Sequence, residues 1–326
     1  MKSIDIVVPA FNEEGCLEPF YERLRPVLDG LPYRFRVLIV DDGSDDHTPE
    51  VCERLVARDP RVGVLRLSRN FGHQAALTAG LDQAGADAVI TMDADLQHPP
   101  EALPDFLNAW ADGAELVSGV RASKQRARLF KRLTSLVFYK VLNLVSPVKI
   151  TENAPDFRLL DQKVVRALRD LREQSRFLRG MYAWVGFRQV EVKYDEHLRT
   201  AGQSHYRNRD MFLFALSAVL SFSRAPLRLA TLFGLLVSGL AFAFGVYALI
   251  QNLVFHEVIR GWTSLAVLLS FLSGVQLLTL GVLGEYLGQV LEETKRRPLY
   301  LVADARLPEL HGSHRPNDDQ ERGDPG

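Results

Sequence analysis

The 326-residue chain contains almost no cysteine and carries almost no net charge. Its two cysteines, Cys16 and Cys52, cannot form a disulfide framework, and two free thiols suit a reducing compartment. With 39 basic and 40 acidic side chains the net charge is −1, so no overall positive field would attract nucleic acid. The segment Met1–Pro9 becomes charged too early for a secretory signal peptide. We therefore expect a polar domain that stays in the cytoplasm and binds no nucleic acid.

Charged residues are also absent from two long stretches near the C-terminus, Leu229–Phe255 and Gly261–Gly284. Each is longer than the roughly 20 residues that a helix needs to cross a bilayer. The alternative, two buried helices of a soluble core, is disfavoured by two such runs side by side. We expect two transmembrane helices within residues 226–292.

Basic residues predict the orientation of these spans. Arg224 and Arg228 precede the first run and Lys295–Arg297 follow the second, whereas the connecting loop His256–Arg260 holds one arginine and one glutamate. The positive-inside rule places both flanks in the cytoplasm. This predicts an integral protein of the inner (cytoplasmic) membrane with a cytoplasmic polar domain.

Residues 1–200 show the alternation of strands and helices that is typical of an α/β domain. No Gly-x-Gly-x-x-Gly follows the first strand, which disfavours a Rossmann-type dehydrogenase. Strands separated by helices of this length predict a parallel sheet with helices on both faces. The expected strands are Ile4–Val8, Phe35–Val40, Val62–Leu67, Asp87–Met92 and Glu115–Gly119, and the expected helices are Glu13–Leu28 (with a start signal at Asn12), Thr48–Arg58, Gln74–Ala84 and Pro100–Ala111.

Polar clusters follow four of these strands: Asn12-Glu13, Asp41-Asp42, Arg69-Asn70 and Asp93–Gln97. Ligands of such sheets bind at the carboxyl ends of the strands. Side chains two apart in an extended chain share one face, so Asp93 and Asp95 present two hard oxygen ligands suited to Mg²⁺ or Mn²⁺. The alternative is a solvated acidic turn. Ser44 and Asp45 are also explained as a turn that caps the helix at Thr48.

The remaining segments change in character. Arg128, Lys131 and other cations interleave with apolar residues over 124–145, a basic amphipathic pattern that favours a helix on an anionic membrane surface. The alternative is an ordinary surface helix packed on the sheet. Residues 201–225 contain a second apolar helix, Met211–Phe222, and the end of the 293–326 tail, residues 303–326, has the composition of a disordered segment.

Several segments together resemble the family-two inverting glycosyltransferases of GT-A fold, specifically the polyprenyl-phosphate sugar transferases. The resemblance covers about residues 4 to 302 and is nearest to the glucosyl transferases that accompany O-antigen glucosylation. One position departs from the pattern: His205 stands where the family's Arg-x-x-Gly-x-Ser-Lys segment has lysine. The matching segments are Val8–Glu14, Val40–Asp46, Ser68–His73, Asp93–Pro100, Pro155–Leu159, Arg199–Tyr206 and Leu283–Gly288.

The resemblance implies inverting transfer of a hexose from a nucleotide sugar, UDP-glucose first, to a polyprenyl phosphate such as undecaprenyl phosphate. UDP-N-acetylglucosamine, UDP-aminoarabinose and GDP-mannose remain alternative donors. It also implies a Mg²⁺ or Mn²⁺ cofactor, a membrane partner and, as in many members, a homo-oligomer. A processive polysaccharide synthase would need Gln-x-x-Arg-Trp and more spans, and a non-catalytic membrane-anchored scaffold is disfavoured by the complete acidic set.

The resemblance also implies roles for individual residues. Asp156 matches an acid proposed as a base in this family, but a lipid monophosphate with a second pKa of about 6 needs little deprotonation, so we expect Asp156 to orient a substrate. His73 is expected near the donor phosphates or as surface charge, and Glu285 at the membrane interface. The implied sets are Asp95 and Asp156 for catalysis; Pro9, Phe11, Asn12, Glu13, Asp41, Asp42, Arg69 and Asp93 for the nucleotide sugar; Asp93, Asp95 and Gln97 for the metal; and Arg121, Arg128, Lys131, Arg199 and Ser204 for the acceptor phosphate.

Overall fold

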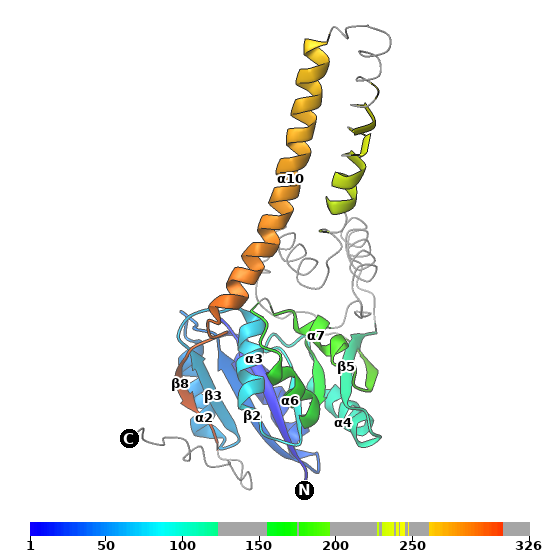
Figure 1. Cartoon of the computed structure of the whole chain (residues 1–326). Helices are drawn as coiled ribbons and strands as arrows, with labels where there is room; N and C mark the ends of the chain where they lie inside the picture. The colour runs from blue at the N-terminus through cyan, green and yellow to red at the C-terminus, as the bar shows by residue number, and fades with distance from the viewer. Residues whose placement is uncertain are drawn as a thin grey trace, which may run out of the picture.

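A computed structural model describes residues 1–122, 155–174, 176–195, 227, 230–237, 239–240, 242–244, 247 and 261–308. Its polar domain is built on an eight-stranded sheet in the order β7-β5-β6-β4-β1-β2-β3-β8 (Figure 1). The central strands β4, β1, β2 and β3 run parallel. The strands are β1 Ser3–Ala10, β2 Arg34–Asp41, β3 Val62–Leu67, β4 Ala88–Thr91, β5 Leu116–Arg121, β6 Arg158–Asp161, β7 Gln189–Tyr194 and β8 Val302–Arg306.

Helices cover both faces of the sheet, as expected from the sequence. The helices α1, α2 and α4 lie over one face, and α3 and α6 lie over the other (Figure 1). The described helices are α1 Leu17–Asp29, α2 Thr48–Arg58, α3 His73–Gln83, the 3₁₀ turn η1 Pro100–Ala102, α4 Leu103–Ala111, α6 Gln162–Asp170, α7 Leu178–Trp184 and α10 Trp262–Lys295.

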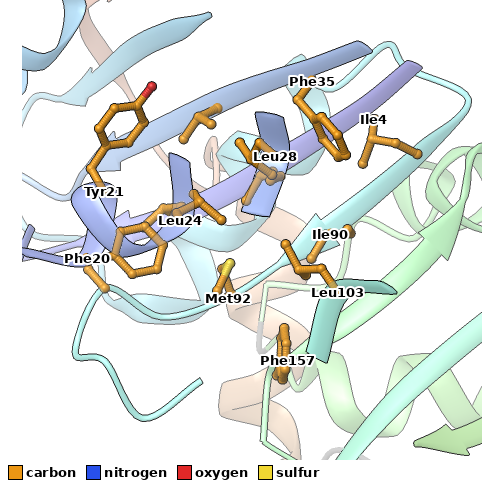
Figure 2. Packing of buried hydrophobic residues seen from close by; sticks show 14 of the residues in the cluster. Ile4, Phe20, Tyr21, Leu24, Leu28, Phe35, Ile90, Met92, Leu103 and Phe157 are labelled. Carbon is orange, nitrogen blue, oxygen red and sulfur yellow. The ribbon is translucent and has the colours of Figure 1, made fainter. Parts of the chain in front are cut away.

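Side-chain alternation along the strands produces two separate cores. Ile4 and Ile6 of β1 belong to the apolar cluster that also contains Phe20 and Leu24 of α1. In Figure 2, Ile4 lies beside Phe35. Val7 of the same strand faces α3 on the opposite side of the sheet. Successive strand side chains point to opposite faces, so one strand contributes to both apolar layers. This double burial explains the near-continuous apolar composition of the central strands.

The sheet is mixed rather than purely parallel, because β6 and β8 run antiparallel to their neighbours. The prediction of disorder from residue 303 is wrong for residues 303–306. This segment forms most of β8, which pairs with β3 although its side chains are all exposed. The strand is held by backbone hydrogen bonds, which composition does not report.

Two helix starts also differ from the sequence-based expectation. The first helix begins at Leu17, and Cys16 rather than Asn12 precedes it. Asn12 has a φ of +55°, a left-handed conformation that asparagine tolerates better than most residues. At the second helix the Ser44 and Asp45 side chains do not cap Thr48; the Asp46 carboxylate instead accepts a hydrogen bond from the Thr48 N–H. The two loops use these polar side chains to contact each other.

Helix α10 extends away from the polar domain (Figure 1). Its part Phe271–Lys295 is long and apolar enough to cross a membrane, and it is the one such helix among the described residues. Large apolar side chains such as Leu269 and Leu277 are exposed along it, as expected for contact with lipid. The helix continues beyond the charge-free run that ends at Gly284 and reaches Lys295, three residues past the expected limit of the spans at residue 292. The first predicted span lies partly outside the described residues.

A buried ion pair joins β1 to β2, and its contribution to the stability of the fold can be tested. Arg36 donates to both Asp5 oxygens at 2.8 and 2.7 Å, and Asp5 also accepts from the N–H groups of Gly85 and Ala86. Both side chains are buried. Arg36→Ala leaves the Asp5 charge buried without its cation, so we expect a loss of about 3–5 kcal/mol in unfolding free energy.

This prediction is checked by denaturation of the full-length protein in detergent. The control is Arg23→Ala, which breaks the exposed Arg23–Glu101 pair and is expected to cost at most about 1 kcal/mol. Equal losses for the two variants would contradict a special role of the buried pair.

Candidate active site

The loops that follow β1 and β2 are joined by hydrogen bonds. The Asn12 N–H donates to Ser44 Oγ at 3.0 Å, and the Asn12 side chain exchanges hydrogen bonds with Asp45. The Glu13 N–H donates to Thr48 Oγ1 at 2.8 Å. Both loops leave the carboxyl ends of neighbouring parallel strands, where ligands of such sheets bind. Phe11 lies beside them with 41% of its surface exposed.

Asp42 holds the loop that precedes α3. Its two oxygens accept hydrogen bonds from the N–H groups of Phe71 and Gly72, each at 2.8 Å. The carboxyl is 2% exposed, and this burial raises its pKa above the ordinary value, although the two backbone donors act in the opposite direction. Gly72 has a φ of +98°, which favours glycine at this turn.

Asp41 and Arg69 also lie at this edge. One Asp41 oxygen accepts from the Ser44 N–H at 2.9 Å, and the other lies 3.3 Å from Arg66 Nε. The Arg69 guanidinium stacks over the Phe71 ring at 4.0 Å and donates to the Asn70 carbonyl. The predicted donor-binding residues are therefore close to one another, with Pro9 buried in β1 beneath them.

The Asp93–Gln97 segment is a turn, so the expectation of an extended chain with both acids on one strand face is wrong. Strand β4 ends at Thr91, and Leu96 has a φ of +65°. The Asp93 N–H donates to His98 Nδ1 at 3.0 Å. Because Nδ1 accepts this hydrogen bond, the ring carries its proton on Nε2 and is neutral. His98 is buried and stacks on Phe157 with ring centroids 5.0 Å apart.

The rest of this turn reaches toward β5. One Asp95 oxygen accepts from the Gln97 N–H at 3.1 Å. Gln97 Oε1 accepts from Arg121 Nη2 at 3.3 Å, which places the last residue of β5 beside the turn. Arg121, predicted for the acceptor phosphate, thus lies next to a predicted metal ligand.

Asp156 is the centre of a cluster of charged groups from three segments. It is 4% exposed, and one of its oxygens lies 3.5 Å from His73 Nε2, which is itself 3.7 Å from Asp93. Arg179 of α7 approaches both Asp156 oxygens at 3.4 Å, and Gln74 donates at 3.3 Å. Besides Asp156, which directly precedes β6, the cluster therefore draws on the start of α3, the turn after β4 and the start of α7.

The charges of this cluster stabilise one another. Burial by itself would raise the pKa of Asp156, but the hydrogen bond with His73 and the charge of Arg179 outweigh it and hold that pKa well below its usual range. Partial burial would lower the pKa of His73, but its contacts with Asp156 and Asp93 raise it to about 9. At neutral pH Asp156 is therefore an anion paired with cations, which makes it a weak base.

Several contacts here escaped the sequence analysis. No local motif marks Arg179 or Gln74, whereas His73 and His98 lie within the recognised segments Ser68–His73 and Asp93–Pro100 but were not assigned these contacts. The predicted helices over 124–145 and Met211–Phe222 lie outside the described residues. The same holds for Arg128, Lys131, Arg199, Ser204 and His205. Glu285 lies on the exposed surface of α10.

The turn after β4 fits a divalent cation in part. Asp93 Oδ1 is buried and accepts no hydrogen bond within the described part of the chain, so one hard oxygen is available. Among those residues no group of three or more His, Cys, Asp or Glu side chains forms a metal site. The predicted set has two acids and an amide, which suits a cation that takes its other ligands from water and substrate phosphates.

Comparison with known proteins identifies the family. The family described as glycosyl transferase family 2 matches residues 5–169. The bactoprenol glucosyl transferase of Shigella phage SfV is 40% identical, covering 93% of this chain and 99% of the relative. The SfII prophage-derived bactoprenol glucosyl transferase of Shigella flexneri is 41% identical over 92% and 97%. An uncharacterized glycosyltransferase of Synechocystis is 41% identical over 92% and 95%.

The chain belongs to glycosyl transferase family 2. It is a glycosyltransferase with a GT-A-like α/β domain and a mixed sheet. The predicted family and enzyme class are confirmed.

The Asp42 contacts lead to a test of the site's architecture. In Asp42→Asn the amide N–H₂ would face a backbone N–H, so one of the two hydrogen bonds is lost. We expect faster hydrogen exchange of the Phe71 and Gly72 amides and a loss of about 1–3 kcal/mol in unfolding free energy. Exchange measured by mass spectrometry reports the loop directly. Asp112→Asn, at an exposed helix end, is the matched control, and unchanged exchange in Asp42→Asn would refute the anchoring role.

Proposed function

We propose that this enzyme transfers glucose from UDP-glucose to undecaprenyl phosphate at the cytoplasmic face of the membrane, with inversion at the anomeric carbon. The carrying observation is the cluster of Asp93, His73, Asp156 and Arg179 at the carboxyl ends of the central strands. It supports a reaction between two phosphate-bearing substrates, because it offers cations together with an Asp93 oxygen that accepts no hydrogen bond among the described residues. Relatives named as bactoprenol glucosyl transferases, alike over nine-tenths of the chain, support the acceptor and the sugar.

The donor nucleoside is assigned to the joined loops after β1 and β2. Phe11 offers an exposed ring for stacking against the base, and Asn12 and Glu13 lie directly beside it. Asp41 and Asp42 form the floor, where Asp42 fixes the loop that carries Arg69. Arg69 lies near the path of the diphosphate in this assignment.

The cation is assigned to Asp93, Asp95 and Gln97 and is Mg²⁺ or Mn²⁺. When bound, it neutralises the charge that develops on the leaving nucleoside diphosphate. The buried Asp93 oxygen supports this placement.

The acceptor phosphate attacks the anomeric carbon from the face opposite the nucleotide. One phosphate oxygen forms the new bond to that carbon while the bond to the donor diphosphate breaks, so an α-linked donor gives a β-linked product. A phosphate with a second pKa of about 6 is already ionised at neutral pH and gives up no proton in this step. Asp156, held as an anion by its cationic neighbours, is therefore assigned to orienting a substrate.

Arginine recognises planar oxygen groups well, which suits Arg121 to the acceptor phosphate beside Gln97. Arg128, Lys131, Arg199 and Ser204 are proposed to complete that subsite. Helix α10 supports a membrane-anchored enzyme that meets its lipid acceptor at the membrane surface. Two spans, a cytoplasmic catalytic domain in the inner membrane and a homo-oligomer belong to the same proposal.

The reaction is tested with a panel of radiolabelled nucleotide sugars and undecaprenyl phosphate, with and without EDTA, followed by separation of the lipid product. We expect a labelled lipid from UDP-glucose that disappears with EDTA. UDP-N-acetylglucosamine, UDP-aminoarabinose and GDP-mannose test the alternative donors. Asp95→Ala should lower the rate at least about 10²-fold, because a charge-stabilising group is lost, while Asp105→Ala on the exposed side of α4 keeps it. No labelled lipid from any donor would reject the proposal.

The role of Asp156 is tested by the pH dependence of the rate. Its pKa lies well below the usual range, so it stays ionised at every assay pH above about 5 and contributes no titration there. We expect activity to rise through about pH 6 as the acceptor becomes a dianion, in wild type and in Asp156→Asn alike. The variant should be about 10²-fold slower through loss of orientation. Disappearance of the acid limb in Asp156→Asn would show instead that Asp156 is the base.

A further inference from the structure

A cavity of about 590 Å³ lies where α10 joins the polar domain. Its walls come from three separate segments: the end of α3 with Asp82, the segment between α6 and α7 with Arg172 and Gln174, and the end of α10 with Glu293, Arg296 and Arg297. None of these residues belongs to the proposed active site. The cavity therefore needs an explanation of its own.

Both carboxylates of the cavity already have partners. Asp82 accepts from Arg172 at 2.8 and 3.2 Å and from the Tyr300 hydroxyl at 2.8 Å. Glu293 accepts from the Gln174 N–H at 2.7 Å. Gln174 also donates its side-chain amide to the Arg297 carbonyl at 2.7 Å, which ties the end of α10 to the polar domain.

Within the described part of the chain, no hydrogen bond is recorded for the guanidinium groups of Arg296 and Arg297. Both residues are exposed, and among the described residues no carboxylate lies within ion-pairing distance of either. Three arginines and two carboxylates line the cavity, so its lining residues have a net charge of +1. Guanidinium groups suit phosphate oxygens, with which they form paired, charge-assisted hydrogen bonds.

The backbone conformation of Arg296 also indicates a role for its side chain. This residue ends α10 with a φ of +49° and a ψ of +35°, the left-handed conformation that glycine normally supplies at a helix end. An arginine backbone is strained in this conformation, so the geometry of the helix end does not explain why arginine occupies the position. Arg296 directly follows the candidate span Phe271–Lys295, so it lies at the end of the span that joins the polar domain.

We propose that this cavity binds a phosphate group, taken either from the headgroup of an anionic phospholipid or from free phosphate. Basic side chains next to a spanning helix attract anionic headgroups. A bound phosphate would contact Arg296 and Arg297 on α10 and Arg172 on the polar domain, and so brace the domain against its membrane helix. This inference concerns a second site and is independent of the transfer reaction.

The test is a calorimetric titration of the full-length protein in uncharged detergent. The probes are dihexanoyl phosphatidylglycerol, dihexanoyl phosphatidylcholine and inorganic phosphate. Binding of phosphatidylglycerol without inorganic phosphate identifies a headgroup site, and binding of inorganic phosphate as well identifies a free-phosphate site; either supports the proposal. Absence of binding by both anionic probes overturns it.

Two variants locate the binding. Arg296→Gly removes the guanidinium and places glycine at the left-handed position, so its Tm without ligand should not fall below wild type. Its affinity for the bound anion should be about fivefold weaker, and that of Arg296→Gln/Arg297→Gln about thirtyfold weaker. Arg54→Gln/Arg58→Gln, which removes two exposed arginines from α2, is the charge-matched control and should change affinity less than about twofold. Unchanged affinity in both cavity variants would also overturn the proposal.

Discussion

The contact of Asp156 with His73 and Arg179 is the interaction on which the organisation of the site depends. A buried carboxylate is costly unless cations and hydrogen-bond donors surround it. Its partners come from α3 and α7, and Thr91 at the end of β4 donates to its backbone carbonyl. The site is therefore assembled only when both helices and the β4–β6 pair are in place. A group held in this way has a fixed position and charge, which suits orientation better than proton transfer.

The loops proposed to bind the donor are held instead by hydrogen bonds to backbone N–H groups and between polar side chains. Asp42 binds two backbone N–H groups, and Asn12 and Ser44 join the first two loops through hydrogen bonds. Backbone donors position a loop without adding a charge that would compete with a diphosphate. Asp93 Oδ1 is buried and accepts no hydrogen bond among the described residues. This oxygen is therefore the site's clearest candidate ligand for a cation.

The junction of α10 with the domain combines an ion pair with hydrogen bonds to backbone groups. Asp82 collects Arg172 and Tyr300, and Gln174 links to α10 through both a side chain and a backbone group. These contacts tie the domain to the helix, and Arg296 and Arg297 lie beside them at the cavity proposed to bind a phosphate group. In the proposed function, such an attachment would hold the site at one height above the bilayer that contains the lipid acceptor.

The sequence by itself determined the parallel α/β core, the apolar helix and the polar residues at the strand ends, because side-chain periodicity and apolar run length are local properties. It also marked Asp42 and Asp93 as candidate site residues, and the family resemblance added Asp156. Only the tertiary structure decided which of them touch. The antiparallel insertion of the short strand β6, the pairing of β8 and the contact of Gln74 with Asp156, 82 residues away, depend on strand order and helix placement. The pairing of Arg179 with Asp156 depends on such long-range packing. So does the position of Arg296 and Arg297 beside Asp82 and Arg172, which no local pattern encodes.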